Sequence, residues 1–259
     1  MVIFAAAVLL AGVPLGSLLW KLGVAGRPPE WVLGQAATRW LVAGRLHGGL
    51  VATSLTLAMG SGLLTSLLAL WLCWLALDRP WFRGGMFAVL AAVWALPGLL
   101  VGLGLKELFV TLAAFGPLDA LLYRGPSYVP VVLGYLVRFL PCAVAALWPL
   151  VRLVPAELRD ASRVEGARPS QEFRWVFLPL LRRPLLAVAM LVAALALGEL
   201  PVNRLVETPG AFTFVRELGD RMHYGPTADV AALCLVMLAM VFGLAITVGM
   251  ATRSKWRGL

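Results

Sequence analysis

Charged side chains are scarce in this sequence. Of its 259 residues, only 14% are Asp, Glu, Lys or Arg, whereas 61% are apolar. In soluble domains, about a quarter of all residues are charged. A water-soluble globule is therefore excluded. At about 20 residues for each crossing, the apolar residues are numerous enough for about six membrane-spanning helices. The composition therefore predicts an all-α polytopic membrane protein.

Residues that carry catalytic or metal chemistry are also few. The three cysteines, Cys73, Cys142 and Cys234, lie singly in apolar segments, without metal-ligand spacing. The two histidines are far apart, and the sequence contains no His-Glu-x-x-His pattern and no Gly-x-Ser-x-Gly elbow. It also lacks the Gly-x4-Gly-Lys-Ser/Thr phosphate loop. We therefore expect no metal site, no bound cofactor, no catalytic residue and no ATP site on this chain.

The charge that is present is mostly basic, with 22 Lys and Arg against 13 Asp and Glu. These basic residues flank apolar runs, as in the cytoplasmic loops of membrane proteins. We therefore expect the chain to contact membrane lipid and not nucleic acid. The densest stretch, residues 152–183, contains seven arginines. If it is cytoplasmic, alternation of the spans places 12 Lys and Arg inside and eight outside. This bias predicts that both termini are cytoplasmic.

The apolar runs predict six spans. They cover residues 2–20, 48–77, 85–105, 128–151, 184–202 and 228–250. The first run lacks a positive n-region, so we expect an uncleaved span rather than a signal peptide. Residues 48–77 would form a helix of about 45 Å, which is one tilted or protruding span.

The connections also carry signals. Residues 22–47 suit a loop with a helix lying at the membrane interface, and residues 106–127 suit a second connection. In the third span, the pair Gly98 and Gly102 is expected to let another helix approach closely.

The arginine-rich stretch is predicted to contain two short helices joined by a turn. Pro155 suits a first helical position, Gly166 a helix stop and Pro169 the start of the second helix, which Leu178-Pro179 would end. The residue pattern alone fits a segment that offers one face to a soluble partner and, equally, a basic loop that only fixes the topology.

Spacing favours the partner-binding interpretation. Asp160-Ala161-Ser162, then Gly166 after three residues, then Val176-x-Leu178-Pro179 after nine more, resembles the EAA loop of ABC-transporter permeases. The family pattern is Glu-Ala-Ala-x3-Gly-x9-Ile-x-Leu-Pro. Every spacing agrees, and Asp160, Ser162 and Val176 are conservative departures.

Further segments extend the resemblance over roughly residues 50–250. They are Tyr135–Pro141, Leu197–Leu200, Thr208–Gly210 and Met222–Gly225, and they look like the iron(III), thiamine and polyamine branch of binding-protein-dependent permeases. The resemblance implies one permease domain over residues 1–259, with a MetI-like core at 48–251 and a cytoplasmic coupling loop at 152–183.

The same resemblance implies function and partners. It predicts an importer subunit of the bacterial inner membrane that carries iron(III) or another small cationic solute. The expected partners are a cytoplasmic ATP-binding subunit, a second permease chain that is identical or homologous, and an external solute-binding protein. The expected ATPase-coupling residues are Asp160, Ala161, Ser162, Glu165, Gly166 and Ala167.

Two charged residues inside the apolar segments are candidates for the solute pathway. Arg138 falls near the middle of the fourth span, where an unpaired charge costs about 2.5 to 3.5 kcal/mol, so it should find an acidic partner. Glu107 and Glu199 are the nearest candidates by depth. A pair that only holds helices in register is the alternative to a role in passage. Glu199 is expected to line the solute pathway, to neutralise Arg138 or to cap a helix near Pro201. The fifth span is expected to extend beyond Glu199.

Two other functions remain open from the sequence. An ion-coupled secondary transporter or channel would need more intramembrane ionisable residues than this chain contains. An intramembrane enzyme would need acid–base chemistry that two histidines in connections do not supply.

Overall fold

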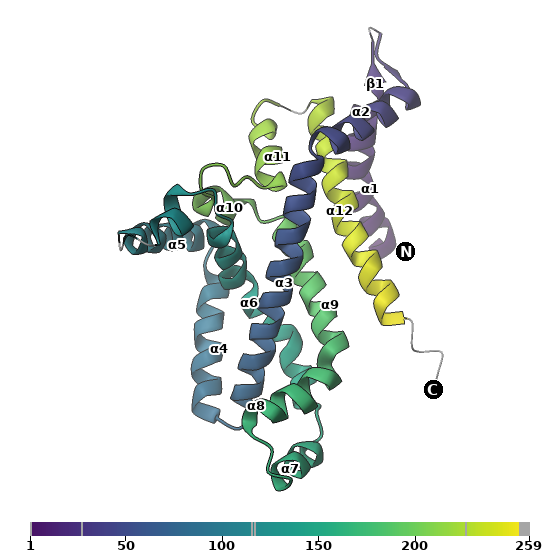
Figure 1. Ribbon diagram of the computed structural model, residues 1–259. Coiled ribbons are helices and arrows are strands. Elements are labelled where there is room, and N and C mark those ends of the chain that lie inside the picture. The colour runs from purple at the N-terminus through teal and green to yellow at the C-terminus, as the bar shows by residue number, and fades with distance from the viewer. Residues whose placement is uncertain (1, 27, 115, 117, 226, 254–259) are drawn as a thin grey trace. The chain divides into compact units, whose positions relative to one another are not determined.

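The computed structural model describes residues 2–26, 28–114, 116, 118–225 and 227–253. Arg27 and the basic tail after Arg253 therefore lie outside the described residues. The chain divides into two compact units, Met1–Ser54 with Thr213–Gly243, and Leu55–Phe212 with Leu244–Leu259. Figure 1 shows that almost every element is a helix.

The first unit contains the N-terminal helix and the predicted interfacial helix. Its elements are α1 (Val2–Gly23), β1 (Val24–Ala25), β2 (Glu30–Trp31) and α2 (Leu33–Leu46). The two short strands pair antiparallel, with Val24 opposite Trp31. Arg39 of α2 donates hydrogen bonds to the carbonyl oxygens of Leu22 and Val24, at 2.7 and 3.0 Å. These bonds attach α2 to the end of α1, where the Leu22 carbonyl has no partner in the next turn of the helix, and to the start of β1.

The same unit also contains α11 (Phe214–Met222) and the start of α12 (Ala228–Arg253). His47 follows α2 and is 8% exposed, with its Nε2 atom 3.7 Å from the Glu217 carboxylate of α11. His47 is therefore buried, although it lies in a connection between helices. Its ring packs edge-on against Phe214, which shields it from solvent.

The second unit holds the helices around the candidate sites. They are α3 (Gly48–Leu77, from Leu55), α4 (Pro80–Ala95), α5 (Gly98–Ala113), η1 (Ala120–Arg124), α6 (Val129–Arg152), α7 (Ala156–Val164), α8 (Pro169–Glu172), η2 (Phe173–Phe177), α9 (Leu178–Leu197) and α10 (Leu200–Val206). α6 packs against α4 and α9, and α5 packs against α10 (Figure 1). The fully buried side chains include Leu70, Leu147, Val144, Phe177 and Val192.

Small residues set the distance between these helices. A Cβ atom on Gly62 of α3 would collide with the Ala189 carbonyl of α9. A Cβ atom on Gly102 of α5 would lie 2.8 Å from the Leu205 side chain of α10. Lipid is as apolar as the helix surfaces, so no hydrophobic effect drives helices together in a membrane. They associate through close packing instead, which glycine permits. The prediction that Gly98 and Gly102 admit another helix is confirmed.

The third predicted span is broken, so the expectation of one continuous helix at 85–105 was wrong. α4 ends at Ala95, α5 begins at Gly98, and their axes are bent by 108°. Pro97 disfavours the helical conformation in the residue before it, and Leu96 accordingly is extended, with φ −76° and ψ 132°. α5 then runs to Ala113, which occupies part of the connection predicted at 106–127.

The fifth predicted span begins earlier and ends earlier than expected. Leu178-Pro179 does not end a helix, because α8, η2 and α9 form one apolar stretch, Pro169–Leu197. The π-helical turn η2 widens the helix before Pro179, which accommodates a proline ring and its missing N–H. At the other end α9 stops at Leu197, so the span does not extend beyond Glu199.

Four described helices are long and apolar enough to cross a membrane, namely Gly48–Leu77, Val129–Arg152, Pro169–Leu197 and Ala228–Thr247. The bent pair α4 and α5 would be a fifth, and the described apolar part of α1, Val8–Gly23, is shorter. The all-α polytopic class is confirmed, with a count close to the six spans expected.

Candidate functional site

α7 is the helix that the spacing pattern predicted to contact a partner. It starts one residue after Pro155 and ends at Val164, and Gly166 follows with φ at +81°. The Gly166 N–H donates to the Arg163 carbonyl and the Ala167 N–H to the Ser162 carbonyl, both at 3.0 Å. This pair of bonds is the Schellman motif, which needs a residue in the left-handed region. The predicted helix stop at Gly166 is confirmed.

The predicted coupling residues divide between two faces of α7. Asp160, Ala161, Glu165 and Gly166 are exposed, while Ser162 and Ala167 are half-buried. Val164, 88% exposed, lies on the outer face with Ala161 and the carboxylates.

The opposite face of α7 carries two arginines that the sequence did not single out. Arg159 donates from Nη2 to both carboxylate oxygens of Asp78, at 2.6 Å, and from Nε to Glu172, at 3.3 Å. Arg163 donates to the same two residues, at 2.6 Å to Asp78 and 3.1 Å to Glu172. These four charged residues, the anchor cluster, connect α7 to the turn between α3 and α4 and to the start of the fifth span.

Electrostatics in the anchor cluster favour the ionised forms of Asp78 and Arg163. Burial alone would raise the pKa of Asp78, but hydrogen bonds and charges from Arg159 and Arg163 outweigh it and hold that pKa below its usual value. The pKa of Arg163 is raised by hydrogen bonds to Asp78 and then to Glu172. Glu172 is only 3% exposed, and both arginines form ion pairs with it.

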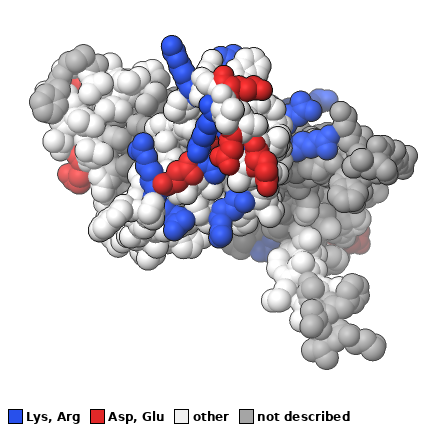
Figure 2. All heavy atoms as spheres, turned by 90° about the horizontal axis from the view of Figure 1, so that it is seen from below, with Lys and Arg blue, Asp and Glu red and all other residues white. Residues whose placement is uncertain are grey.

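Figure 2 shows the molecule from below, the side on which α7 lies in Figure 1, with acidic and basic side chains intermixed over this face. The signal in the sequence was the spacing of Arg159 and Arg163, which is one helical turn. Their partner Asp78 is 81 residues from Arg159, so only the fold could identify it.

The second candidate site surrounds Arg138 at the break between α4 and α5. Its Nη1 atom donates to the Leu96 carbonyl at 3.1 Å, and its guanidinium lies 5.7 Å from the centre of the Trp94 ring. Its Nε atom is 3.9 Å from the Glu199 carboxylate. The break at Pro97 thus leaves a carbonyl for Arg138 to bind, and the expected acidic partner is Glu199.

Glu199 has two roles in the structure. Its Oε1 atom accepts from the Val202 N–H at 3.3 Å, which caps the N-terminus of α10. A Cβ atom on Gly98 would lie only 3.0 Å from this oxygen, so glycine admits the carboxylate there. Glu107 lies on α5 and makes no ion pair with Arg138 within the part of the chain that the structure describes. Of the three roles weighed for Glu199, the structure contains the contacts for two, an ion pair with Arg138 and the cap of a helix, while the third, lining the solute path, stays a prediction.

Helices of this length, with a separate exposed helix between two of them, define a class, the multi-pass membrane proteins. The sequence profile of the family described as binding-protein-dependent transport system inner membrane component matches residues 67–253. This is most of the chain, and the chain therefore belongs to that family.

Individual relatives agree with this assignment. The trehalose transport system permease SugB of Mycobacterium tuberculosis is 27% identical over 245 residues, which are 88% of this chain and 85% of SugB. The diacetylchitobiose uptake permease DasC of Streptomyces coelicolor is 32% identical over 45% of this chain and 44% of its own. The putative 2-aminoethylphosphonate permease PhnV of Salmonella choleraesuis is 26% identical over 63% of this chain and 58% of its own.

A solved structure confirms the fold. A chain of the inward-facing MetNI methionine ABC transporter superposes with a TM-score of 0.62 at 15% identity, covering 79% of this chain and 94% of that chain. The protein is thus a MetI-like permease subunit of an ABC importer and a multi-pass protein of the bacterial inner membrane. It is a transport component and not an enzyme, and its class implies an ATPase and a solute-binding protein as partners.

Proposed function

We propose that the outer face of α7 binds the ATP-hydrolysing subunit and that the anchor cluster passes its motion to the spans. The observation that carries this proposal is the opposed arrangement of α7. One face exposes Asp160, Ala161 and Glu165, and the other is bound through Arg159 and Arg163. A short helix held on one side and capped by a Schellman motif transmits a push, whereas a flexible loop absorbs it.

The organisation we propose follows from this role. Residues 1–259 form one permease domain with its core at 48–251, and residues 152–183 face the cytoplasm. ATP is bound and hydrolysed on the partner subunit. A second permease chain, identical or homologous, completes the pathway, and an external binding protein delivers the solute.

The test is a double charge reversal, Asp160→Lys with Glu165→Lys. It should abolish copurification of the ATPase and reduce ATP-driven uptake at least tenfold, because both carboxylates face the partner. The matched control is Glu30→Lys with Asp229→Lys, which makes the same charge change at exposed residues of the first unit. Unchanged copurification and uptake in the first variant would refute the role of α7.

For the substrate, we infer a sugar rather than iron(III). The relatives named for a solute transport trehalose, diacetylchitobiose and 2-aminoethylphosphonate, and these names do not support the iron(III) expectation. Arg138 and Glu199 supply two charged hydrogen-bonding groups close to one another. Such groups suit a hydroxyl-rich solute, whose hydroxyls can both donate and accept hydrogen bonds.

The substrate test is uptake of four labelled solutes by cells that contain the whole transporter. We expect accumulation of trehalose or diacetylchitobiose that stops when the ATPase is inactivated. Accumulation of ferric iron or 2-aminoethylphosphonate alone would refute the sugar assignment. Uptake that persists without the ATPase and collapses with the proton gradient would instead support the ion-coupled alternative.

A further inference from the structure

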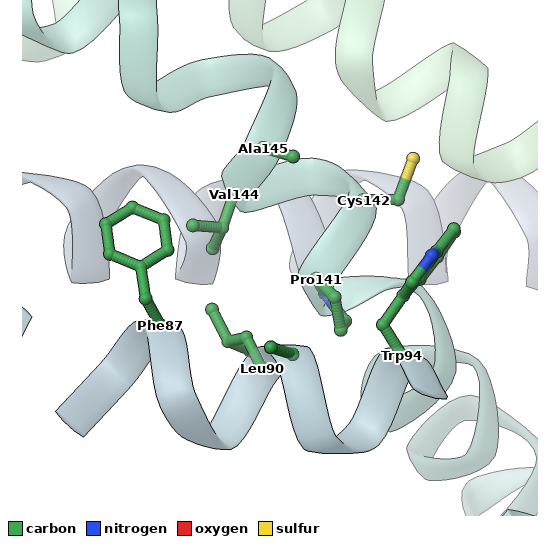
Figure 3. A pocket seen from close by; sticks show the side chains of 8 residues that line it. Phe87, Leu90, Trp94, Pro141, Cys142, Val144 and Ala145 are labelled. Atoms are coloured by element: carbon green, nitrogen blue, oxygen red, sulfur yellow. The ribbon is translucent and has the colours of Figure 1, made fainter. Parts of the chain in front are cut away.

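Two adjoining cavities lie between α4 and α6 in the second unit. One, of about 430 Å³, is lined by Pro80, Arg83, Gly84, Phe87, Trp148 and Arg152. The next, of about 370 Å³, shares Phe87. In Figure 3, Phe87, Leu90 and Trp94 follow one another along α4 and face Pro141, Cys142 and Val144 of α6. The shared phenylalanine places a basic cavity next to an apolar one.

The basic cavity contains two arginines and no acidic residue in its lining. Arg83 and Arg152 are exposed, and among the residues that the structure describes neither forms an ion pair or a side-chain hydrogen bond. This contrasts with Arg159 and Arg163 of the anchor cluster, which are both paired. Two positive charges in the lining of one cavity, without a counter-charge among its lining residues, attract an anion.

The depth of each cavity fits one leaflet of a bilayer. Arg152 ends α6 and Arg83 lies in the first turn of α4, next to the polar turn at Asp78, so the basic cavity is at the water interface. Trp148 lies beside it, as expected for a ring at headgroup level. From Phe87 to Trp94 the apolar cavity extends over about 10 Å of helix, less than the roughly 15 Å of half a hydrocarbon layer.

We propose that these two cavities together bind one anionic phospholipid. Its phosphate lies between Arg83 and Arg152, and one acyl chain lies in the apolar cavity from Phe87 to Trp94. Charge complementarity selects an anionic headgroup, and the apolar cavity beside the basic one, on the far side of Phe87, selects a lipid over a soluble anion. Basic pockets between transmembrane helices recognise anionic lipid headgroups in this way.

The glycines at the start of α4 provide a matched pair of variants. Gly84 lines the basic cavity and Gly85 does not, and a Cβ atom on either would meet nothing within 4 Å. Gly84→Leu therefore fills the site without a clash in the protein, and Gly85→Leu is its control. For charge, Arg83→Gln with Arg152→Gln removes both headgroup contacts. The matched control is Arg182→Gln with Arg183→Gln, which removes two exposed arginines that line neither cavity.

The experiment is native mass spectrometry of the full chain, purified with its partner subunits in mild detergent and titrated with dioleoyl phosphatidylglycerol or dioleoyl phosphatidylcholine. Phosphatidylglycerol should bind at least tenfold more tightly than phosphatidylcholine. The double arginine variant should lose about 25-fold in affinity for phosphatidylglycerol, since each basic residue near a membrane surface contributes about fivefold. Gly84→Leu should lose at least tenfold, and both controls should bind as the unaltered chain does.

Several outcomes would overturn the proposal. Equal binding of the two lipids, or full binding by either Gly84→Leu or the double arginine variant, would refute it. A competition experiment on the unaltered chain does not depend on how the variants fold. If equimolar inorganic phosphate displaced phosphatidylglycerol from the unaltered chain, the site would bind a free anion and not a lipid. If the unaltered chain bound no lipid and the double arginine variant no longer copurified with a second permease copy, that result would refute the lipid site and identify a contact between chains.

Discussion

At the scale of single residues, Gly166 shows why the coupling pattern requires glycine. Its φ of +81° lies in the left-handed region, which costs a residue with a Cβ atom about 1 to 2 kcal/mol. We expect Gly166→Ala to loosen the end of α7 and reduce ATP-driven uptake several-fold. Gly166→Asn is the matched control, because asparagine tolerates this conformation, and it should retain more uptake. Equal loss in both variants would show that backbone conformation is not the cause.

Asp78 is the residue at which pH should act. The pKa of Asp78 is lower in the folded chain than its ordinary value of about 3.9. Its ion pairs therefore stabilise the fold fully when the pH is above the ordinary pKa. This stabilisation is lost as the pH falls through the lower pKa of the folded chain. Asp78→Asn should lower stability by about 0.5 to 1 kcal/mol at neutral pH, since the carboxylate is partly exposed and screened.

This stability difference is measured by thermal unfolding of both proteins in detergent between pH 3 and pH 7. The gap between their melting temperatures should be constant above about pH 5 and close below about pH 4. Asp160→Asn, on the outer face of α7, should show no such gap at any pH. A gap that widened in acid would contradict the assigned direction of the shift.

At the scale of elements, the contact between α5 and α10 depends on Gly102. In a Gly102→Leu variant the first side-chain atom would lie 2.8 Å from Leu205 and 3.3 Å from the Val202 backbone, which forces the helices apart. We expect a loss of about 1 to 3 kcal/mol in stability, as for overpacked cores. The measurement is the melting temperature of the purified chain. Gly104→Leu, two residues along the same helix, meets nothing within 4 Å and should melt as the unaltered protein does.

Elements also show where sequence patterns predict well. The uncharged run at residues 48–77 coincides with α3, and residues 128–151 differ from α6 by one residue at each end. Continuous apolarity predicts that a segment enters the membrane, but it carries no information on bends. Pro97 therefore broke a predicted span, whereas Pro179 did not end a helix, because a π-helical turn accommodates it.

At the scale of the whole molecule, the sequence alone predicted the class of protein. The lack of charge predicts membrane helices, and the spacing from Asp160 to Pro179 resembles that of permeases, because composition and spacing can both be read without the fold. The pairing of Arg159 and Arg163 with Asp78 and of Arg138 with the Leu96 carbonyl required the folded chain, as did the presence of Arg83 and Arg152 in the lining of one cavity. Ion pairs and cavities join residues far apart in sequence, so only the packing of helices decides which charges meet and which are left for a ligand.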